Sequence, residues 1–363
     1  MIYLDYQATT PLAPEAREAM LRHLDGPDGG GFGNPHSAHR MGRMAAASIE
    51  AAREKIASLF PSGGTIILTS GATEALNLAV RGTAHHGGNR GTVACSAIEH
   101  SAVGDTAKSS GDSHVLTVDE AGICDSDQAL PDGTRMIAVM QTNNEIGTIQ
   151  PLAQWSARAK NVGALMLVDG VQAYGKMPLT QEADLIAISA HKFHGPKGVG
   201  ALWIREGTDL QEVQSGGGQE RGLRSGTLSP ALIAGMGAAA QLCAERMDED
   251  TAHAEALWKR ARELFADWEL NGSADARYKG NLNIRKEGLD VARLMSDCRD
   301  IMFSAGSACA SGSGRPSHVL RAIGLSDAEA KSSIRLGFGR YTALAELESA
   351  AAVIQASAKS QLS

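Results

Sequence analysis

A lysine and an aspartate in this sequence each follow an apolar run, at positions where side chains can take part in chemistry. Lys192 comes shortly after ADLIAIS, and Asp169 ends LMLVD. Open α/β sheets bind their ligands at the carboxyl ends of the strands. An amine there can lose its proton beside other cations and attack an aldehyde, and a carboxylate can keep a pyridinium nitrogen protonated. Taken singly, Lys192 could instead be a surface lysine after a strand, and Asp169 could be a helix cap.

An earlier turn is suited to bind a phosphate group. In IILTSGATEALNLAV, residues 70–73 join an apolar run to a helical pattern, so backbone N–H groups and the positive end of a helix dipole meet there. Thr73 adds a hydroxyl. The turn lacks the lysine of G-x-x-x-x-G-K-[ST] and does not fit G-x-G-x-x-G, so one small phosphate suits it better than ATP or NAD. A tight turn with a helix cap is the alternative.

Three histidines accompany these segments. His100 follows a predicted strand, where an imidazole can lie on a cofactor ring and exchange protons with a substrate, or serve the structure alone. His191 and His194 are close enough in sequence to suggest a metal. No third ligand at a recognisable spacing accompanies them, so we expect no metal site.

Cys309 is expected to be a reactive thiol on a mobile loop, because Gly and Ser dominate SAGSACASGSGRPS. A thiol on such a loop can visit a buried site and carry a group outward. The other four cysteines lie in strand-like or helical patterns or in a short turn, where a buried or incidental thiol is expected: Cys95, Cys124, Cys243 and Cys298. Five cysteines without a C-x-x-C pair argue against a disulfide framework and a four-thiolate metal site.

An α/β core must position these residues. Short runs rich in Val and Ile alternate with helical patterns, as is typical of a parallel sheet buried on both faces. The predicted strands are Thr65–Thr69, Thr92–Ser96, His114–Val118, Arg135–Gln141, Leu165–Asp169, Leu185–Ser189 and Gly200–Ile204. The helical pattern AQWSARAKNVG is predicted to end on Gly163, a C-cap glycine.

The chain is expected to divide into three parts. Its 363 residues, 43% of them hydrophobic, suffice for a large core and a smaller one. We predict an N-terminal arm at 1–14 that packs on the small domain, a large domain at 15–254, and a small α+β domain at 255–363 that carries the cysteine loop, 304–316. A glycine-rich break at 215–230 precedes a long Ala-rich helix to about residue 268.

Charge and hydropathy exclude some classes of partner. The formal net charge is −7, from 34 basic and 41 acidic residues, with no dense basic run, so we expect no nucleic-acid ligand. The N-terminal residues show no basic region followed by an apolar stretch, and no apolar run is long enough to cross a bilayer. We expect a cytoplasmic protein that does not associate with a membrane.

Motifs in the order of one enzyme family run along nearly the whole chain. They are YLDYQATTP (3–11), GNPHSAHRMGR (33–43), TSGATEALN (69–77), EH (99–100), NNEIGTIQP (143–151), VDGVQ (168–172), SAHKFHGPKGVGAL (189–202), GGGQERGLRSGT (216–227) and SAGSACASG (304–312). The chain resembles the cysteine desulfurases of the NifS/IscS type, class V aminotransferase-like pyridoxal-phosphate enzymes of fold type I. The resemblance implies a large domain with a mostly parallel seven-stranded sheet and a smaller α+β domain.

By this resemblance the cofactor is pyridoxal 5'-phosphate, and Lys192 would hold it as a Schiff base. Asp169 would pair with the pyridinium nitrogen, His100 would stack on the ring, and Gln172 would bond the ring hydroxyl. Lys192 and His100 would also act in catalysis. The phosphate would be held from both subunits of a homodimer, by Ala72, Thr73, Ser189 and His191 of one subunit and Thr227 of the other.

The resemblance also implies the substrate and the product. Asn144 and Arg335 would hold the carboxylate of L-cysteine, and His36 would line the substrate pocket. Cys309 would take the sulfur as a persulfide while L-alanine is released. The persulfide would pass to a sulfur-acceptor protein, an iron–sulfur scaffold or a sulfur carrier, for iron–sulfur cluster assembly or tRNA thiolation.

Other readings of the sequence stay open. A selenocysteine lyase or an aminotransferase would have the same fold, and a catalytically quiet scaffold that binds partner proteins is a third possibility. Ser215 stands where many relatives have a histidine, and the last residues, AKSQLS, lack the extension with which IscS-like relatives help to bind their scaffold. A role of that histidine would be lost or moved here, and the missing extension leaves docking of the scaffold open.

Overall fold

The computed structural model describes residues 1–24, 26, 31–86, 91–306 and 316–362. Its centre is a seven-stranded sheet in the order β2-β8-β7-β6-β5-β3-β4, in which β8 runs antiparallel to both neighbours and the other pairs are parallel. The strands are β2 (Gly64–Thr69), β3 (Thr92–Ser96), β4 (Ser113–Leu116), β5 (Thr134–Ala138), β6 (Leu165–Asp169), β7 (Leu185–Ser189) and β8 (Gly200–Arg205). All seven predicted strands are confirmed, with ends displaced by up to three residues.

The sheet is buried on both faces because successive side chains of each strand enter different cores. On β2, Ile66 and Leu68 join a core with α2 (Arg40–Ala57), α5 (Leu152–Val162) and α6 (Pro230–Leu264), whereas Ile67 joins a core with α3 (Ala72–Gly82) and α4 (Ser101–Ser110). The predicted end of α5 is confirmed, since Gly163 caps it with a φ of 69°. α1 (Pro14–Leu21) packs against α6.

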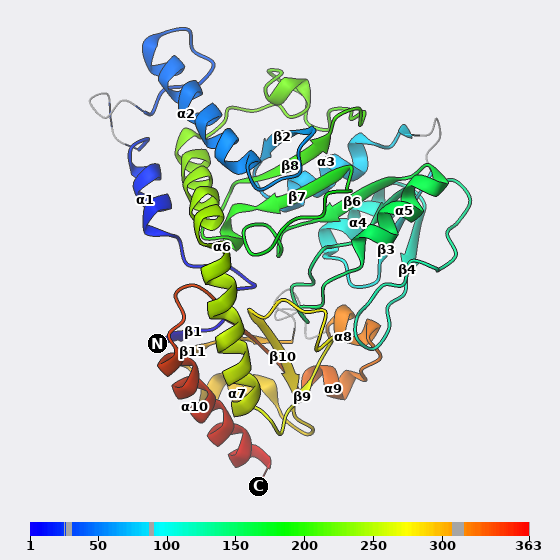
Figure 1. The fold of residues 1–363 in the computed structure, drawn as a ribbon, viewed down its shortest axis with the longest axis vertical. Helices are drawn as coiled ribbons and strands as arrows, with labels where there is room; N and C mark the ends of the chain where they lie inside the picture. The colour runs from blue at the N-terminus through cyan, green and yellow to red at the C-terminus, as the bar shows by residue number, and fades with distance from the viewer. Residues whose placement is uncertain (25, 27–30, 87–90, 307–315, 363) are drawn as a thin grey trace.

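A second, smaller sheet lies beyond the large one, and α6 runs from one to the other (Figure 1). Its antiparallel order is β12-β13-β10-β9. The elements of this part are β9 (Glu269–Leu270), β10 (Asn281–Arg285), α7 (Val291–Asp297), β11 (Ile301–Met302), β12 (Ser304–Ala305), α8 (His318–Ala322), α9 (Asp327–Lys331), β13 (Ser333–Gly337) and α10 (Leu344–Leu362). The predicted boundary at 254/255 falls inside α6 and stays a prediction. On α6, Met236 packs in the core of the large sheet and Leu257 in that of the small sheet.

The N-terminal segment connects the two sheets. β1 (Ile2–Tyr3) pairs in parallel with β11, and Leu4 is buried in the core of the small sheet. A few residues later, the Thr10 N–H donates to the His191 carbonyl at 2.8 Å, next to the end of β7. The arm therefore fixes the small sheet relative to the strand ends of the large one.

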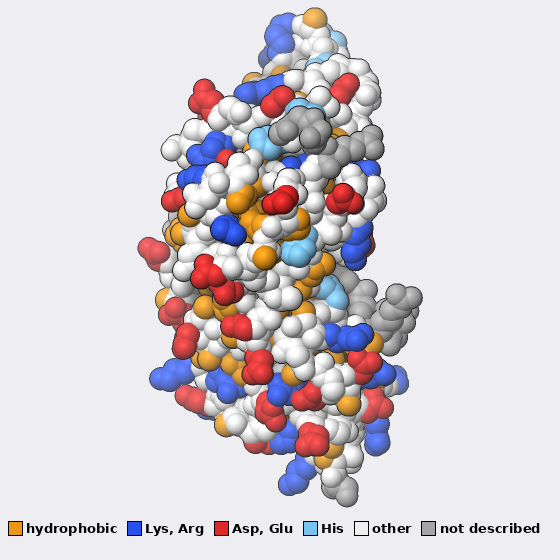
Figure 2. All heavy atoms as spheres, turned by 90° about the vertical axis from the view of Figure 1, so that its right-hand side faces the viewer, with side chains coloured by type: hydrophobic (Ala, Val, Ile, Leu, Met, Phe, Trp, Pro, Cys, Tyr) orange, Lys and Arg blue, Asp and Glu red, His pale blue; other side chains and the backbone are white. Residues whose placement is uncertain are grey.

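The surface agrees with a chain of mixed charge. Acidic and basic side chains are interspersed over the lower half of the face shown in Figure 2. In the described parts of the chain, no helix has the length and apolarity needed to cross a membrane.

Candidate active site

Lys192 lies in a tight turn directly after the central strand β7. Residues Ala190–Lys192 form a single 3-10 turn. The Lys192 amine donates to two backbone carbonyls of the N-terminal arm, that of Gln7 at 2.6 Å and that of Ala8 at 2.9 Å. Carbonyl oxygens only accept hydrogen bonds, so each contact uses one N–H group of the lysine amine. The arm thereby holds the lysine at the carboxyl end of the sheet.

Asp169 ends β6, the strand next to β7, so the aspartate and the lysine share one edge of the sheet. The carboxylate accepts from the Val171 N–H at 2.9 Å and is 7% exposed. Burial raises the pKa of Asp169, while the charges of His100 and Lys192 and the Val171 N–H oppose that rise. A buried carboxylate is stabilised by a cation beside it, so this position fits a protonated ring nitrogen.

The predicted phosphate turn lies where β2 passes into α3. α3 begins at Ala72, and the preceding Gly71 lies close to the adjoining strands: a Cβ on Gly200 would come within 2.7 Å of the Gly71 Cα. Because glycine leaves this space open, the N-terminus of α3 can approach the end of β7. Its unpaired N–H groups and its dipole there suit an anion.

His100 has two functions in the structure. Its Nδ1 accepts from the Ala102 N–H at 3.1 Å and thus caps α4, which leaves the proton of the neutral ring on Nε2. The same side chain lines the cavity beside Asp169. The capping role and the predicted cofactor role are therefore compatible.

Arg335 enters the site from the small sheet. Its side chain on β13 is fully buried, its Nη2 lies 2.7 Å from Asp5 Oδ1, and its Nη1 donates to the Asn144 carbonyl at 3.2 Å. Among the described residues, its Nε has no hydrogen-bond partner. A buried N–H without a partner is costly, so the guanidinium is suited to receive a further acceptor such as a carboxylate.

These elements enclose a cavity of about 470 Å³. Most of the predicted site residues line it together: Ala72, Thr73, His100, Asn144, Asp169, Gln172, Ser189, His191, Lys192 and Arg335. Burial and nearby lysines lower the pKa of His191 to about 4, so its ring is neutral at ordinary pH and shares a hydrogen bond with Thr9 Oγ1 at 3.2 Å. Among the described residues, no group of three or more His, Cys, Asp or Glu could hold a metal ion.

Comparison with known proteins decides the family. Residues 2–349 match the family described as aminotransferase class-V. The chain belongs to that family. It is 40% identical to the cysteine desulfurase IscS of Rickettsia bellii, over 97% of this chain and 90% of the relative. It is also 40% identical to the mitochondrial cysteine desulfurase of Eremothecium gossypii, over 96% of this chain and 74% of that one.

Solved structures agree with this class V aminotransferase membership. A NifS-like protein superposes with a TM-score of 0.89 at 31% identity, over 98% of each chain. A structure of SspA in complex with cysteine superposes with a TM-score of 0.81 at 32% identity, over 94% of this chain and 100% of that one. The predicted resemblance to cysteine desulfurases and the predicted fold class are thus confirmed.

Two predicted site residues lie away from the cavity of this class V chain. His36 lines a separate hollow of about 230 Å³ that Glu220 and Arg221 also line. Thr227 is exposed on the glycine-rich loop after β8. The position of Thr227 agrees with the expectation that it serves a neighbouring subunit, which stays a prediction. His36 does not line the cavity of its own chain, so its predicted place in the substrate pocket also stays a prediction.

The glycine-rich loop itself is firmly held. Arg53 pairs with Glu220 at 2.7 Å, and Arg224 pairs with Glu74 at 2.7 Å on the first turn of α3. Thr227 therefore follows closely on a segment that two ion pairs tie to α2 and α3.

Cys309 lies outside the described residues, so its placement stays a prediction. The four described cysteines are buried, and burial raises the pKa of each thiol: Cys95, Cys124, Cys243 and Cys298. Thiols of raised pKa are poor nucleophiles near neutral pH. None of these four is thus suited to accept sulfur.

Several residues at the site had no predicted role. Gln7 and Ala8 line the cavity and hold Lys192, Asp5 holds Arg335, and Lys176 contacts Gln172. The motif YLDYQATTP was the available signal for the first three. Lys176 follows VDGVQ by only a few positions, but nothing in the local pattern distinguishes it from a surface lysine.

Proposed function

We propose that this chain is a cysteine desulfurase that uses pyridoxal 5'-phosphate to move sulfur from L-cysteine to Cys309, with release of L-alanine. The observation that carries the proposal is the placement of Lys192 and Asp169 at the ends of neighbouring strands, β7 and β6, around one cavity. The cysteine desulfurases among its relatives support the choice of substrate.

The residues around the cavity fit the cofactor group by group. Asp169 would face the ring nitrogen, Gln172 the ring hydroxyl and His100 the ring face. Phosphate would be bound by the N-terminal turn of α3 and the turn after β7, through Ala72, Thr73, Ser189 and His191, with Thr227 from a second subunit. Neutral His191 can donate one N–H to such an anion without carrying charge.

When bound, pyridoxal phosphate supplies an electron sink that makes the α-proton of an amino acid removable. Lys192, covalently linked to the cofactor at rest, would be freed by the incoming substrate and would then take that proton. Gln7 and Ala8 carbonyls are in position to hold the protonated amine afterwards. The arm therefore contributes to catalysis by fixing where the base resides.

Substrate would be held by its carboxylate. Arg335 offers its buried Nε–H, and the neighbouring Asn144 side chain lines the same cavity. His100, with its proton on Nε2, can exchange a proton with the substrate thiol. Sulfur transfer then breaks the C–S bond of the substrate and forms an S–S bond at the Cys309 thiolate, and the electron pair left on carbon takes a proton to give alanine.

Thr227 and His36 lie away from their own chain's cavity, which supports a homodimer in which each subunit completes the other site. We further propose an iron–sulfur scaffold or a sulfur carrier as acceptor and a cytoplasmic location. The identity of the acceptor is a separate question from the reaction itself.

One assay distinguishes this function from its competitors. In a single turnover the purified protein should convert L-cysteine to L-alanine without any added keto acid, and protein-bound sulfur should appear in equal amount. Turnover that requires a keto acid would establish an aminotransferase instead. A kcat/KM for L-selenocysteine far above that for L-cysteine, with no bound sulfur, would establish a selenocysteine lyase.

A further inference from the structure

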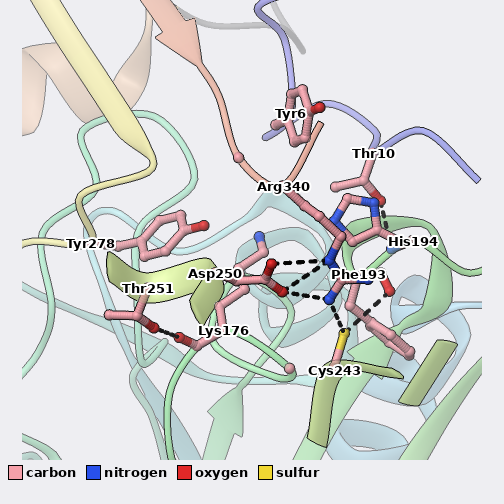
Figure 3. A pocket seen from close by; sticks show the side chains of 12 residues that line it. Tyr6, Thr10, Lys176, Phe193, His194, Cys243, Asp250, Thr251, Tyr278 and Arg340 are labelled. Atoms are coloured by element: carbon pink, nitrogen blue, oxygen red, sulfur yellow. Dashed lines mark hydrogen bonds and ion pairs between the residues drawn. The ribbon is translucent and has the colours of Figure 1, made fainter. Parts of the chain in front are cut away.

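Lys176 lies between the cofactor cavity and a second, much smaller one. Its Nζ donates to Gln172 Oε1 at 2.9 Å and lies 5.2 Å from the centre of the Tyr278 ring. On its other side it lines a cavity of about 30 Å³, shown in Figure 3, together with Asp250 and Arg340. Lys176 is thus adjacent to the cofactor site without being part of its lining.

The contacts of Gln172 fix the orientation of its amide group. Lys176 has only N–H groups to give, so the atom it touches must be the amide oxygen. The Gln7 carbonyl can only accept, so the atom 3.0 Å from it must be Nε2. This buried amide is thus held at its oxygen and at its nitrogen. Its Nε2 has one remaining N–H, so the nitrogen end acts as a donor toward any further partner.

We propose that Lys176 is a positioning residue that keeps Gln172 in this donor orientation and strengthens its remaining N–H. A cationic donor on the oxygen of an amide polarises the group and makes its N–H a better donor. The partner suited to such an N–H is an anionic oxygen, which here would be the ring oxygen of the cofactor. This inference rests on the proposed function, because it concerns how the cofactor is tuned.

The charges around Lys176 define the pH range in which it acts as a cationic donor. Burial, and then the charge of Lys192, lower the pKa of Lys176 to about 7, and Cys243 partly opposes them. Asp250 lines the same small cavity but is already paired with Arg340, whose Nε donates to Asp250 Oδ2 at 2.9 Å. Tyr278, also buried there, has a raised pKa and stays neutral. Below the pKa of Lys176 the ammonium is directed toward Gln172 rather than neutralised by a carboxylate, and above it the neutral amine still has N–H groups to donate.

Loss of Lys176 should change the ionisation of the linked cofactor in one direction. A weaker donor at the ring oxygen and one less positive charge nearby both favour the proton on the nitrogen that links Lys192 to the cofactor. The pH midpoint of the visible absorbance band of the holoenzyme should therefore rise in Lys176→Met, by about 1 pH unit. Lys176→Arg, which keeps the charge and the donor, should restore a midpoint close to that of the wild type.

A double-mutant cycle separates action through Gln172 from a general effect. In the Gln172→Leu background, adding Lys176→Met should move the midpoint by about half as much or less. Lys279→Met is the matched control, because Lys279 also lies over an aromatic ring, 4.1 Å from the centre of Trp258, without touching Gln172. That control should leave the midpoint unchanged.

Two results would overturn this inference and leave the proposed function standing. One is a midpoint in Lys176→Met equal to that of the wild type, and the other is a full shift on adding Lys176→Met to the Gln172→Leu variant. A wild-type protein with no such band, even after incubation with pyridoxal phosphate, would overturn the proposed function and this inference together. The measurements thus distinguish the two failures.

Discussion

Arg335 Nη2 lies 2.7 Å from Asp5 Oδ1, and this ion pair joins the small sheet to the N-terminal arm. Arg335 is fully buried, and Ser304 Oγ donates to the same Asp5 oxygen at 2.9 Å. Ser304 begins the 304–316 segment in which Cys309 lies. One carboxylate therefore holds both the arginine of the cavity and the start of the cysteine segment.

Asp5→Asn should weaken substrate binding. The amide keeps the shape but removes the charge that orients the buried guanidinium, so we expect the KM for L-cysteine to rise by about 10- to 100-fold while the cofactor band is retained. Steady-state kinetics measures this. Glu269→Gln, which removes an exposed partner of Arg285, serves as the control and should change KM by less than about twofold. An unchanged KM in Asp5→Asn would show that the pair does not support the substrate site.

Lys192 should carry the cofactor. The purified protein should be yellow, and borohydride reduction followed by peptide mapping should place the label on Lys192, because that amine lies in the turn after β7, at the edge of the sheet where Asp169 ends β6. Lys192→Ala should abolish turnover even where some cofactor stays bound. A label on Lys197, which also lines the cavity, or on Lys176 would refute the assignment.

Thr227 should contribute to a cofactor site across a subunit interface. Thr227→Ala removes one hydrogen bond to an anion, so cofactor affinity should fall by about 10-fold with the dimer intact. Light scattering and a cofactor titration check both quantities. Thr208→Ala, on the loop after β8, should leave both unchanged. A monomer that binds cofactor as tightly as the wild type is the contrary outcome.

The stability of the cofactor-free protein should depend on pH through Lys176. Its pKa is about 7 when folded and ordinarily 10.5, so between these values the unfolded chain binds more protons and stability rises with pH. The loss of folding stability caused by burying the Lys176 ammonium is therefore fully present below pH about 7, and it vanishes above the pKa of the unfolded chain. Lys176→Met should raise the melting temperature at pH 7 by about 2–4 °C and by less at pH 9. A gain that is equal at both pH values would contradict the lowered pKa.

Much of the fold and of the site was accessible from the sequence, for identifiable reasons. Strands such as β6 and β7 are apolar up to their last residue because both faces are buried, and this makes them easy to recognise. Lys192 and Asp169 follow from their places at the ends of these strands. β9, β11 and β12 have two residues each, too few for a periodic pattern.

Most of the site contacts that were not predicted are long-range. Asp5 and Arg335 are 330 residues apart in the sequence, and Gln7 and Lys192 are 185 residues apart. No local period encodes such pairs, because the arm is extended and its partners come from different sheets. Lys176 was missed for another reason: only its burial beside Gln172 distinguishes it from a solvated lysine.

The most direct test of the account is single-turnover chemistry with Cys309→Ser. The variant should keep its yellow colour and bind L-cysteine, because neither step uses the thiol. It should form neither the persulfide nor the accompanying L-alanine, since a serine hydroxyl is a far poorer sulfur acceptor than a thiolate. Alanine formation and intact-protein mass after addition of L-cysteine report both. Near-normal alanine production by Cys309→Ser, or a persulfide that maps to Cys95, Cys124, Cys243 or Cys298, would contradict the proposed mechanism.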